Sequence, residues 1–288
     1  MASALSSLSQ VRARYPQLAG FKASFGIAVF VLLIVTGLCA PWIAPHDPAR
    51  QDLMAAMMPP DWIGPYVLGT DHVGRDILSR IIYGARVSLL IAVSVVVFSG
   101  LVGITLGVIS GYFGGRVDGL IQKGLEVFWA FPPLLLAIAI VAFIGQGLTI
   151  VIIALVSQRW IPYCRIARAE TMALREREFV VAARSLGGRH LHIIRRHILP
   201  NILPSVIVVA AFAMASAIIA EAALSFLGLG VPPTIPTWGG MLADARAYIS
   251  TSWWMALFPG LAIFLTVLGV NLLGDALRNQ FDPKLKPL

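Results

Sequence analysis

Few residues in this sequence have a type and spacing that could form a catalytic, metal-binding or transport site. Only 12% of the 288 residues are charged, and ionisable residues inside apolar segments are functional candidates because a charge in a membrane interior is costly. Glu221 and Asp275 fall near the ends of such segments, where interface or structural roles are more common. Arg159 falls about 16 Å along its segment at the helical rise per residue, close to the middle. We therefore expect Arg159 to face a translocation cavity or to pair with a partner chain, unless its side chain extends to an interface.

The histidines and cysteines offer weaker candidates for chemistry. His190, His192 and His197 do not share one helical face, and no cysteine or carboxylate joins them, so a solvated or partner-facing cluster is favoured over a metal site. Cys39 and Cys164 are expected at opposite membrane faces and unpaired. The sequence has no G-x-x-x-x-G-K-[ST] loop to hold nucleotide phosphates. We predict no catalytic residue, no cofactor and no metal in this chain.

The elements that position these residues are membrane helices. Hydrophobic residues make up 58% of the chain, a composition that excludes a soluble domain, a disordered chain and a collagen-like chain. The first apolar run is too long for a signal peptide and is interpreted as a retained helix. Uncharged runs of sufficient length predict an all-α membrane protein with six transmembrane helices near residues 22–44, 87–112, 121–144, 148–168, 200–227 and 254–277.

The distribution of basic residues predicts the orientation in the membrane. Of the 22 lysines and arginines, 16 lie on the termini and even-numbered loops and five on the opposite side. Basic residues concentrate on cytoplasmic loops, so both termini are expected in the cytoplasm. This bias also accounts for the net charge of +8 without a nucleic-acid partner.

A long inner segment, residues 166–199, contains the most informative pattern. Phe179, Ala182, Ala183 and Leu186 follow the i, i+3, i+4, i+7 spacing of one helical face, and a glycine pair at 187–188 ends the pattern. The spacing predicts an amphipathic helix near 175–187, followed by a second short segment at 189–199. Either a helix resting on the membrane surface or a docking helix for a soluble partner would show this pattern.

The same segment resembles the EAA signature of ABC-importer permeases. Ala182 and Ala183 are followed after three residues by Gly187, and after nine more by a four-residue segment that ends in Leu199 and Pro200. The sequence departs from the family pattern at Val181, where glutamate is usual, and at His197, where isoleucine is usual.

Further segments resemble the peptide/nickel (Opp/Dpp/Nik) branch of these permeases, in its C-type subunit. They lie between residues 40 and 283, and the tail after Arg278 departs from the usual pattern. The matching segments are LGTDHVGRDILSR at 68–80 with Gly84, Arg86 and Ser88, LSFLGLG at 224–230, PTWG at 236–239 and NLLGDALR at 271–278.

The resemblance implies the MetI-like permease fold of a type I ABC importer in a bacterial inner membrane. The expected partners are a B-type permease, two ABC ATPases that bind ATP and Mg, an extracytoplasmic substrate-binding protein and the lipid bilayer. The expected parts are residues 1–85 (tail, first helix and outer segment), 86–280 (five-helix core) and 281–288 (tail). The expected ATPase-coupling residues are Glu178, Ala182, Ala183, Arg184, Gly187, Leu199 and Pro200.

The translocation path is assigned to Arg159 and to Pro132, because the Pro132–Pro133 pair interrupts the third span and transporters use broken helices at substrate sites. A static kink is the alternative for this pair. Di- and oligopeptides are the expected substrates, with nickel, metal chelates or glycosides as alternatives. A membrane-embedded enzyme or a passive channel is more remote: the former needs facing carboxylates or histidines inside the spans, and the latter gives the inner helix no role.

Overall fold

The computed structural model of the protein describes residues 16–281, and this part consists of helices and connections without a β-strand. Five of its helices are long and apolar enough to cross a membrane, and the bent pair α4 and α5 makes a sixth if it counts as one span. The all-helical fold with five to six spans confirms the predicted fold class. The long helices are α2 (Pro16–Ile43), α3 (Ile77–Phe113), α6 (Leu148–Arg175), α9 (Leu199–Phe226) and α11 (Trp254–Phe281).

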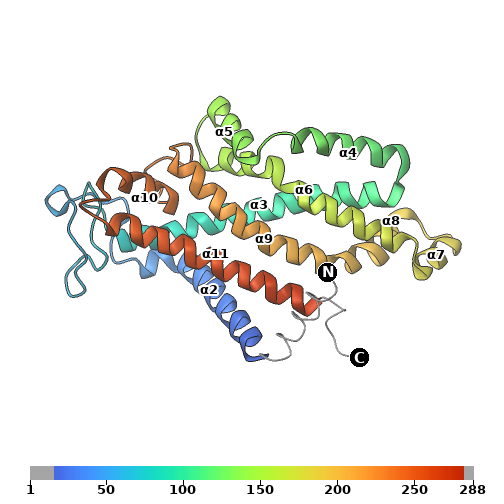
Figure 1. Ribbon diagram of the computed structural model, residues 1–288, viewed down its shortest axis with the longest axis horizontal. Coiled ribbons are helices and arrows are strands. Elements are labelled where there is room, and N and C mark those ends of the chain that lie inside the picture. Colours follow the sequence, from blue (N-terminus) through green and yellow to red (C-terminus); the bar gives the residue numbers. More distant parts are fainter. Residues whose placement is uncertain (1–15, 282–288) are drawn as a thin grey trace, which may run out of the picture.

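The long helices run lengthwise between two differently built ends (Figure 1). At one end lie α7 (Glu178–Ser185) and α8 (His190–Ile193), which we call the α7 end. At the other lie α10 (Trp238–Ala245) and the connection 44–76, which we call the α10 end. The terminal residues 1–15, and residues 282–288 of the tail expected at 281–288, lie outside the described part of the chain.

Helix α3 begins ten residues earlier than the sequence predicts. Asp76 caps it: the Asp76 carboxylate accepts a hydrogen bond from the Ser79 backbone N–H at 3.0 Å, which satisfies one of the free donors of the first turn. The expected start at residue 87 is therefore wrong, because Arg80 and Arg86 are accommodated within the helix. The boundary expected between residues 85 and 86 falls inside α3.

The third predicted span, 121–144, is two helices. Helix α4 (Gly115–Trp129) and helix α5 (Pro133–Ile144) meet at an angle of 79°. Pro132 and Pro133 lack a backbone N–H, and proline disfavours helical conformation in the preceding residue, so the helix stops at Trp129 and restarts at Pro133. A simple kink within one helix is the wrong description of this segment.

The expected second inner segment, 189–199, is continuous with the span that follows it. Helix α8 passes through a π-helical turn, Ile194–Ile198, directly into α9. Helix α9 ends in a Schellman motif, in which Gly228 has φ +75° and the Leu229 N–H donates to the Leu224 carbonyl at 2.9 Å.

Glycines allow close backbone approach between two pairs of helices, α3 with α6 and α2 with α11. Gly103, Gly107 and Gly111 recur every four residues on α3, and a Cβ added at each would lie 2.3, 2.4 and 2.7 Å from carbonyl oxygens of α6. On α2, a Cβ at Gly26 would lie 2.7 Å from the Leu273 backbone nitrogen of α11. Small residues at this spacing let membrane helices approach closely, and they fix α3 against α6.

Candidate functional site

Helix α7 is short and ends in a well-defined cap. Gly187 has φ +81°, its N–H donates to the Arg184 carbonyl, and the Gly188 N–H donates to the Ala183 carbonyl, both at 3.0 Å. These bonds form a Schellman motif, whose left-handed position favours glycine. A Cβ on Gly188 would lie 2.7 Å from the Ala183 oxygen, so the predicted helix stop at 187–188 is confirmed for a conformational reason at the first position and a steric reason at the second.

One side chain of α7 faces the bundle and the opposite side is exposed. Val180 is fully buried in an apolar cluster with Val108, Tyr163 and Ile193, and Ala183 is half-buried against it. Among the residues expected to contact an ATPase, Glu178, Ala182, Arg184 and Gly187 are exposed. Small residues on the exposed side leave room for another protein surface to approach closely.

Exposed apolar side chains surround these small residues. Leu186 is 89% exposed, and Phe179 and Val181 are 45% exposed. The predicted apolar face of Phe179, Ala182, Ala183 and Leu186 thus points mainly away from the bundle, and Val180 alone makes the deep contact. We call Phe179, Ala182, Leu186 and Gly187 the α7 surface.

Tyr112 of α3 connects helix α7 to the bundle. The Arg184 guanidinium lies 5.7 Å from the centre of the Tyr112 ring, within the range of a cation–π contact. The Tyr112 hydroxyl lies 3.0 Å from His190 Nδ1. Arg184, expected only as an ATPase contact, therefore also packs on its own chain.

Leu199 and Pro200 begin α9 beside this cluster. Leu199 is half-buried against it, and Pro200 is exposed in the first turn. The structure therefore brings the two halves of the expected coupling segment, 178–187 and 199–200, around one apolar cluster.

An ion pair fixes α4 to α6 near the same end. The Arg168 guanidinium donates two hydrogen bonds of 2.6 Å to the Asp118 carboxylate, one to each oxygen. Ser110 of α3 also donates to Asp118. This bidentate pair joins three helices, and the sequence analysis did not identify it because the partners are 50 residues apart.

Arg159 lines a cavity of about 240 Å³ between α5, α6 and α9. Its Nη2 donates a hydrogen bond of 3.0 Å to the Ser216 carbonyl oxygen. Pro132 is not among the lining residues, whereas its neighbour Pro133 is. Gln158 holds the break between α4 and α5, because its amide nitrogen donates to the Phe128 and Phe131 carbonyls at 3.0 and 2.9 Å.

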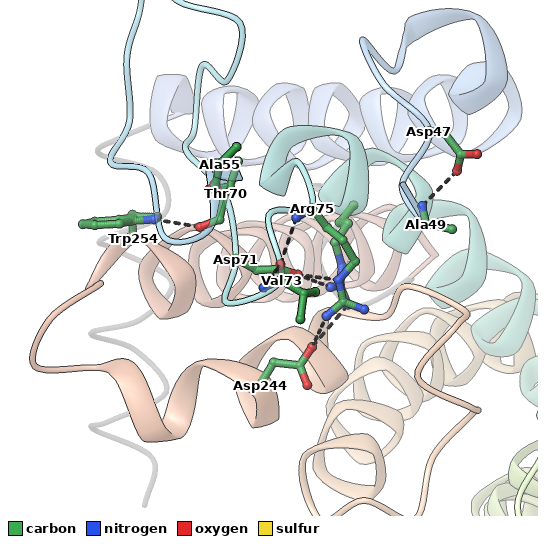
Figure 2. Close-up of polar contacts among 10 residues, drawn as sticks. Asp47, Ala49, Ala55, Thr70, Asp71, Val73, Arg75, Asp244 and Trp254 are labelled. Carbon is green, nitrogen blue, oxygen red and sulfur yellow. Dashed lines mark hydrogen bonds and ion pairs between the residues drawn. The ribbon is translucent and has the colours of Figure 1, made fainter. Parts of the chain in front are cut away.

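The α10 end contains a cluster of two carboxylates and two arginines, three of them buried, which we call the ion-pair cluster: Asp71, Arg75, Arg80 and the partly exposed Asp244. Arg75 donates to Asp71 at 2.6 Å and to Asp244 at 2.9 Å (Figure 2). Arg80 pairs with Asp71 and approaches Asp244 to 3.4 Å. Asp71, Arg75 and Arg80 are each less than 10% exposed, so the charges balance one another inside the protein.

The ion-pair cluster lowers the pKa of Asp71. Burial by itself raises the pKa of this carboxyl, but the positive charges of Arg80 and Arg75 and hydrogen bonds from the Arg75 and Val73 backbone N–H groups outweigh it. The pKa of Asp71 therefore lies below its ordinary value. Asp71 also shapes the turn 71–75, because its carboxylate accepts hydrogen bonds from the Val73 and Arg75 backbone N–H groups.

Residues of the resembling segments contact one another at the α10 end. The Trp238 indole N–H donates to the Ile81 carbonyl at 3.0 Å, and a Cβ on Gly84 would lie 2.8 Å from the Trp238 ring. Trp254 of α11 donates to the Thr70 carbonyl at 3.2 Å (Figure 2). The segments 84–88 and 236–239 thus pack together through Gly84 and Trp238, and Trp254 of α11 holds the segment 68–80.

Metal-ligating groups gather at the α10 end and not at the three histidines. In the described part of the chain, one set of potential ligand atoms lies within mutual reach, from Asp71, His72 and Asp244. Both carboxylates are already paired with arginines, so the set does not suit a cation. Cys39 and Cys164 are both free, as predicted.

Comparison with known families assigns this architecture. Residues 103–287 match the model of the binding-protein-dependent transport system inner membrane component, and residues 23–60 match that of the N-terminal transmembrane domain of oligopeptide transport permease C. The first match alone covers more than half of the chain. The chain belongs to this family of transport permeases.

Individual relatives align with nearly the whole permease. The chain is 47% identical over 273 residues to the di/tripeptide transport system permease protein DppC of Pseudomonas aeruginosa (strain UCBPP-PA14), which covers 92% of this chain and 89% of that protein. It is 40% identical over 281 residues to the dipeptide transport system permease protein DppC of Alkalihalophilus pseudofirmus, covering 97% and 92% of the two chains.

A solved structure shares the fold of the permease. A chain of the MetNI methionine ABC transporter in inward-facing conformations matches with a TM-score of 0.57 and 16% identity, covering 70% of this permease and 97% of that chain. The resemblance to ABC-importer permeases and to the MetI-like fold is therefore confirmed, and the protein is a multi-pass membrane protein.

Proposed function

We propose that this permease forms half of the translocation path of an ATP-driven importer for di- and oligopeptides. The observation that carries the proposal is the alignment, over about nine-tenths of the chain, with relatives named as di/tripeptide and dipeptide permeases. A B-type permease supplies the other half of the path. An extracytoplasmic binding protein delivers the peptide, and the chain itself performs no catalysis.

The proposed orientation places the α7 end and both termini in the cytoplasm of a bacterium, with the chain in the inner membrane. The basic residues of the segment 165–196 support this side, since lysines and arginines concentrate on cytoplasmic loops. The α10 end then faces the binding protein.

The α7 surface is the proposed docking site for one of two ATPases, which bind ATP and Mg. Its exposed Leu186 and Phe179 supply apolar contact area, and Ala182 and Gly187 allow close approach. ATP-driven closure of the ATPases would displace α7, and the Val180 contact and the Tyr112–Arg184 contact would transmit that displacement to α3. Such rigid-body motion switches the access of the path, and ATP binding, which favours one of the two states, supplies the free energy.

The docking proposal is tested with Ala182→Arg in the assembled importer. Ala182 is exposed, so the substitution is compatible with the fold but adds bulk and charge to the α7 surface. We expect loss of ATPase co-purification and of peptide uptake into proteoliposomes. The control is Ala173→Arg, the same substitution at an exposed position of α6, and it is expected to behave as the wild type. Unchanged ATPase binding by Ala182→Arg would contradict the assignment of the α7 surface.

The substrate class is tested with the same proteoliposomes. ATP-dependent accumulation of a radiolabelled dipeptide, and no accumulation of nickel ion or a glycoside, is expected when the cognate binding protein is present. Accumulation of nickel without the dipeptide would contradict the peptide assignment while leaving the permease assignment intact.

A further inference from the structure

The cavity between α5, α6 and α9 combines apolar walls with one unneutralised cation. Its lining includes the apolar residues Pro133, Leu134, Ala137, Leu155, Ile219 and Ala220, with Gln158, Arg159 and Ser216 as its polar residues. Leu134 is 40% and Ile219 is 51% exposed, so the cavity opens at the surface of the chain. A ligand or a partner permease can therefore reach it.

Arg159 has hydrogen-bonding capacity left over in this cavity. A guanidinium carries five N–H donors, and the Arg159 group makes one hydrogen bond to a backbone carbonyl, that of Ser216. Between residues 16 and 281, no carboxylate lies within 4.0 Å of it, in contrast to Arg168, which has Asp118. The neighbouring Gln158 amide is occupied by its bonds to Phe128 and Phe131 and does not compete for an anion.

The depth of Arg159 makes an anionic ligand favourable. It lies eleven residues into α6 from Leu148, about 16 Å at the helical rise per residue, which is about half of a bilayer core of roughly 30 Å. A charge at this depth is costly unless it is paired. Arginine suits a carboxylate because its planar donors bind both oxygens at once.

We propose that Arg159 binds the C-terminal carboxylate of a peptide in transit, while the apolar walls contributed by α5 and α9 receive its side chains. The inference rests on the proposed function and adds a recognition element within the permease itself, separate from the binding protein. A carboxylate of the partner permease that pairs permanently with Arg159 is the competing arrangement, and it predicts no selectivity for a free peptide carboxylate.

The test measures binding of radiolabelled dialanine to the complete importer in nanodiscs without the binding protein. Competition by unlabelled dialanine and by its C-terminal amide compares ligands that differ at the carboxylate. We expect the wild type to prefer the acid by roughly tenfold or more, the range of a hydrogen bond to a charged group. In Arg159→Gln, acid and amide are expected to bind alike, through loss of acid binding alone.

Two further variants make the test specific. Arg165→Gln removes another arginine of α6, which stacks over Trp129 at 4.1 Å, and is expected to keep the wild-type preference. Arg159→Lys keeps the charge but not the two-pronged geometry, and is expected to reduce the preference severalfold. If Arg159→Gln does not assemble, Arg159→Lys provides the comparison.

The outcomes separate this inference from the proposed function. Absence of dialanine binding or of acid preference in the wild type, or equal loss of acid and amide binding in Arg159→Gln, would overturn the carboxylate site. ATP-dependent uptake of dialanine by the wild type with its binding protein would still support a peptide importer. Failure of that uptake as well would overturn both.

Discussion

The two ends of this permease are held by different kinds of interaction. At the α10 end, the ion-pair cluster joins the connection 68–76, α3 and α10 through charged groups at hydrogen-bonding distance, of which Asp71, Arg75 and Arg80 are buried. At the α7 end, a helix of eight residues is attached by one fully buried side chain, Val180, and by the contact of Arg184 with Tyr112. The charged groups of the ion-pair cluster have partners within the chain, whereas α7 is attached by few contacts and leaves side chains such as Leu186 exposed.

The difference lies in what attaches each end to the bundle, because both ends expose apolar side chains: Ile63 of the connection 44–76 is 98% exposed and Leu186 is 89% exposed. A buried pair that loses one member leaves an uncompensated charge, so the α10 end tolerates little rearrangement. The α7 end retains exposed apolar side chains such as Leu186, which favour burial against another protein. In the proposed importer, the α10 end with its paired charges would face the binding protein, and the lightly attached α7 would contact the ATPase.

The substitution Asp71→Asn is the strongest test of the contrast between the α10 end and the α7 end. Removal of this charge leaves Arg80, which is 3% exposed, with Asp244 alone, and breaking a buried pair costs about 3–5 kcal/mol of unfolding free energy. We expect a large fall in the thermal midpoint of the detergent-purified permease, followed by circular dichroism. Asp244→Asn, at a more exposed site, should cause a smaller fall. Equal midpoints for Asp71→Asn and wild type would show that the cluster is not the stabilising feature.

Acidification tests the same cluster without mutation. Because the folded-state pKa of Asp71 is lowered, its charged form contributes stability at pH values above the ordinary carboxyl pKa of about 4. That contribution is lost as the pH falls below about 4 and through the folded-state pKa. The difference in thermal midpoint between wild type and Asp71→Asn should therefore shrink between pH 6 and pH 3. A difference that stays constant over this range would argue against an ionised Asp71 in the cluster.

Gly107→Val tests the connection between the two ends. A Cβ at Gly107 would lie 2.4 Å from the Cys164 carbonyl of α6, so α3 and α6 must separate, at a cost of about 1–3 kcal/mol by analogy with overpacked cores. We expect a lower thermal midpoint and reduced uptake in proteoliposomes. Gly119→Val is the control, because a Cβ there meets no atom within 4 Å. A midpoint for Gly107→Val no lower than that of the control would rule out tight α3–α6 packing.

Val180→Ala weakens the anchor of α7 by removing two buried methyl groups, a change of roughly 1–2 kcal/mol from apolar burial. Transport is expected to fall more than global stability, because α7 would dock on the ATPase but transmit its movement poorly. ATP hydrolysis and uptake measured together should show more ATP consumed per peptide. Val181→Ala, at a half-exposed neighbour, is expected to preserve the ratio. An unchanged ratio in Val180→Ala would contradict the role of Val180 as the mechanical contact.

Arg184→Ala is expected to have the smallest effect. The contact joins the exposed Arg184 to the buried Tyr112 ring, and a cation–π interaction with an exposed cation contributes about 0.5–1 kcal/mol, so the thermal midpoint should change little. Uptake should decrease modestly, and Arg184→Lys should restore part of it. A fall in midpoint as large as that of Asp71→Asn would remove the contrast between the two ends.

Local sequence patterns predicted much of the fold but few of its contacts. The apolar runs located the long helices, and the glycine pair at 187–188 located the end of α7. The earlier start of α3 depends on Asp76 and Ser79, a capping pattern that is present in the sequence but was outweighed by the nearby arginines. The proline pair indicates a break between α4 and α5, whereas its 79° angle and the hydrogen bonds that Gln158 of α6 makes to it are seen only in the structure.

Some candidate sites are visible in the local sequence, and others form only when distant residues come together. The small residues of the α7 surface are read directly from a local helical pattern, because the helix repeat decides which residues share a face. Asp71 and Asp244 are 173 residues apart and meet only through the packing of α3 and α10. The glycine spacing at 103, 107 and 111 was visible in the sequence, yet only the structure identifies α6 as its partner.

The sequence by itself determined that this protein lives in a membrane, how its apolar segments divide, and where a short amphipathic helix lies, because these depend on composition and short-range periodicity. Tertiary structure decided that Val180 faces inward, that Arg159 lines a cavity without a carboxylate partner in the described part of the chain, and that the charges of the α10 end neutralise one another. Those outcomes depend on which distant helices come into contact, and close helix packing and buried charge pairing are set by three-dimensional proximity.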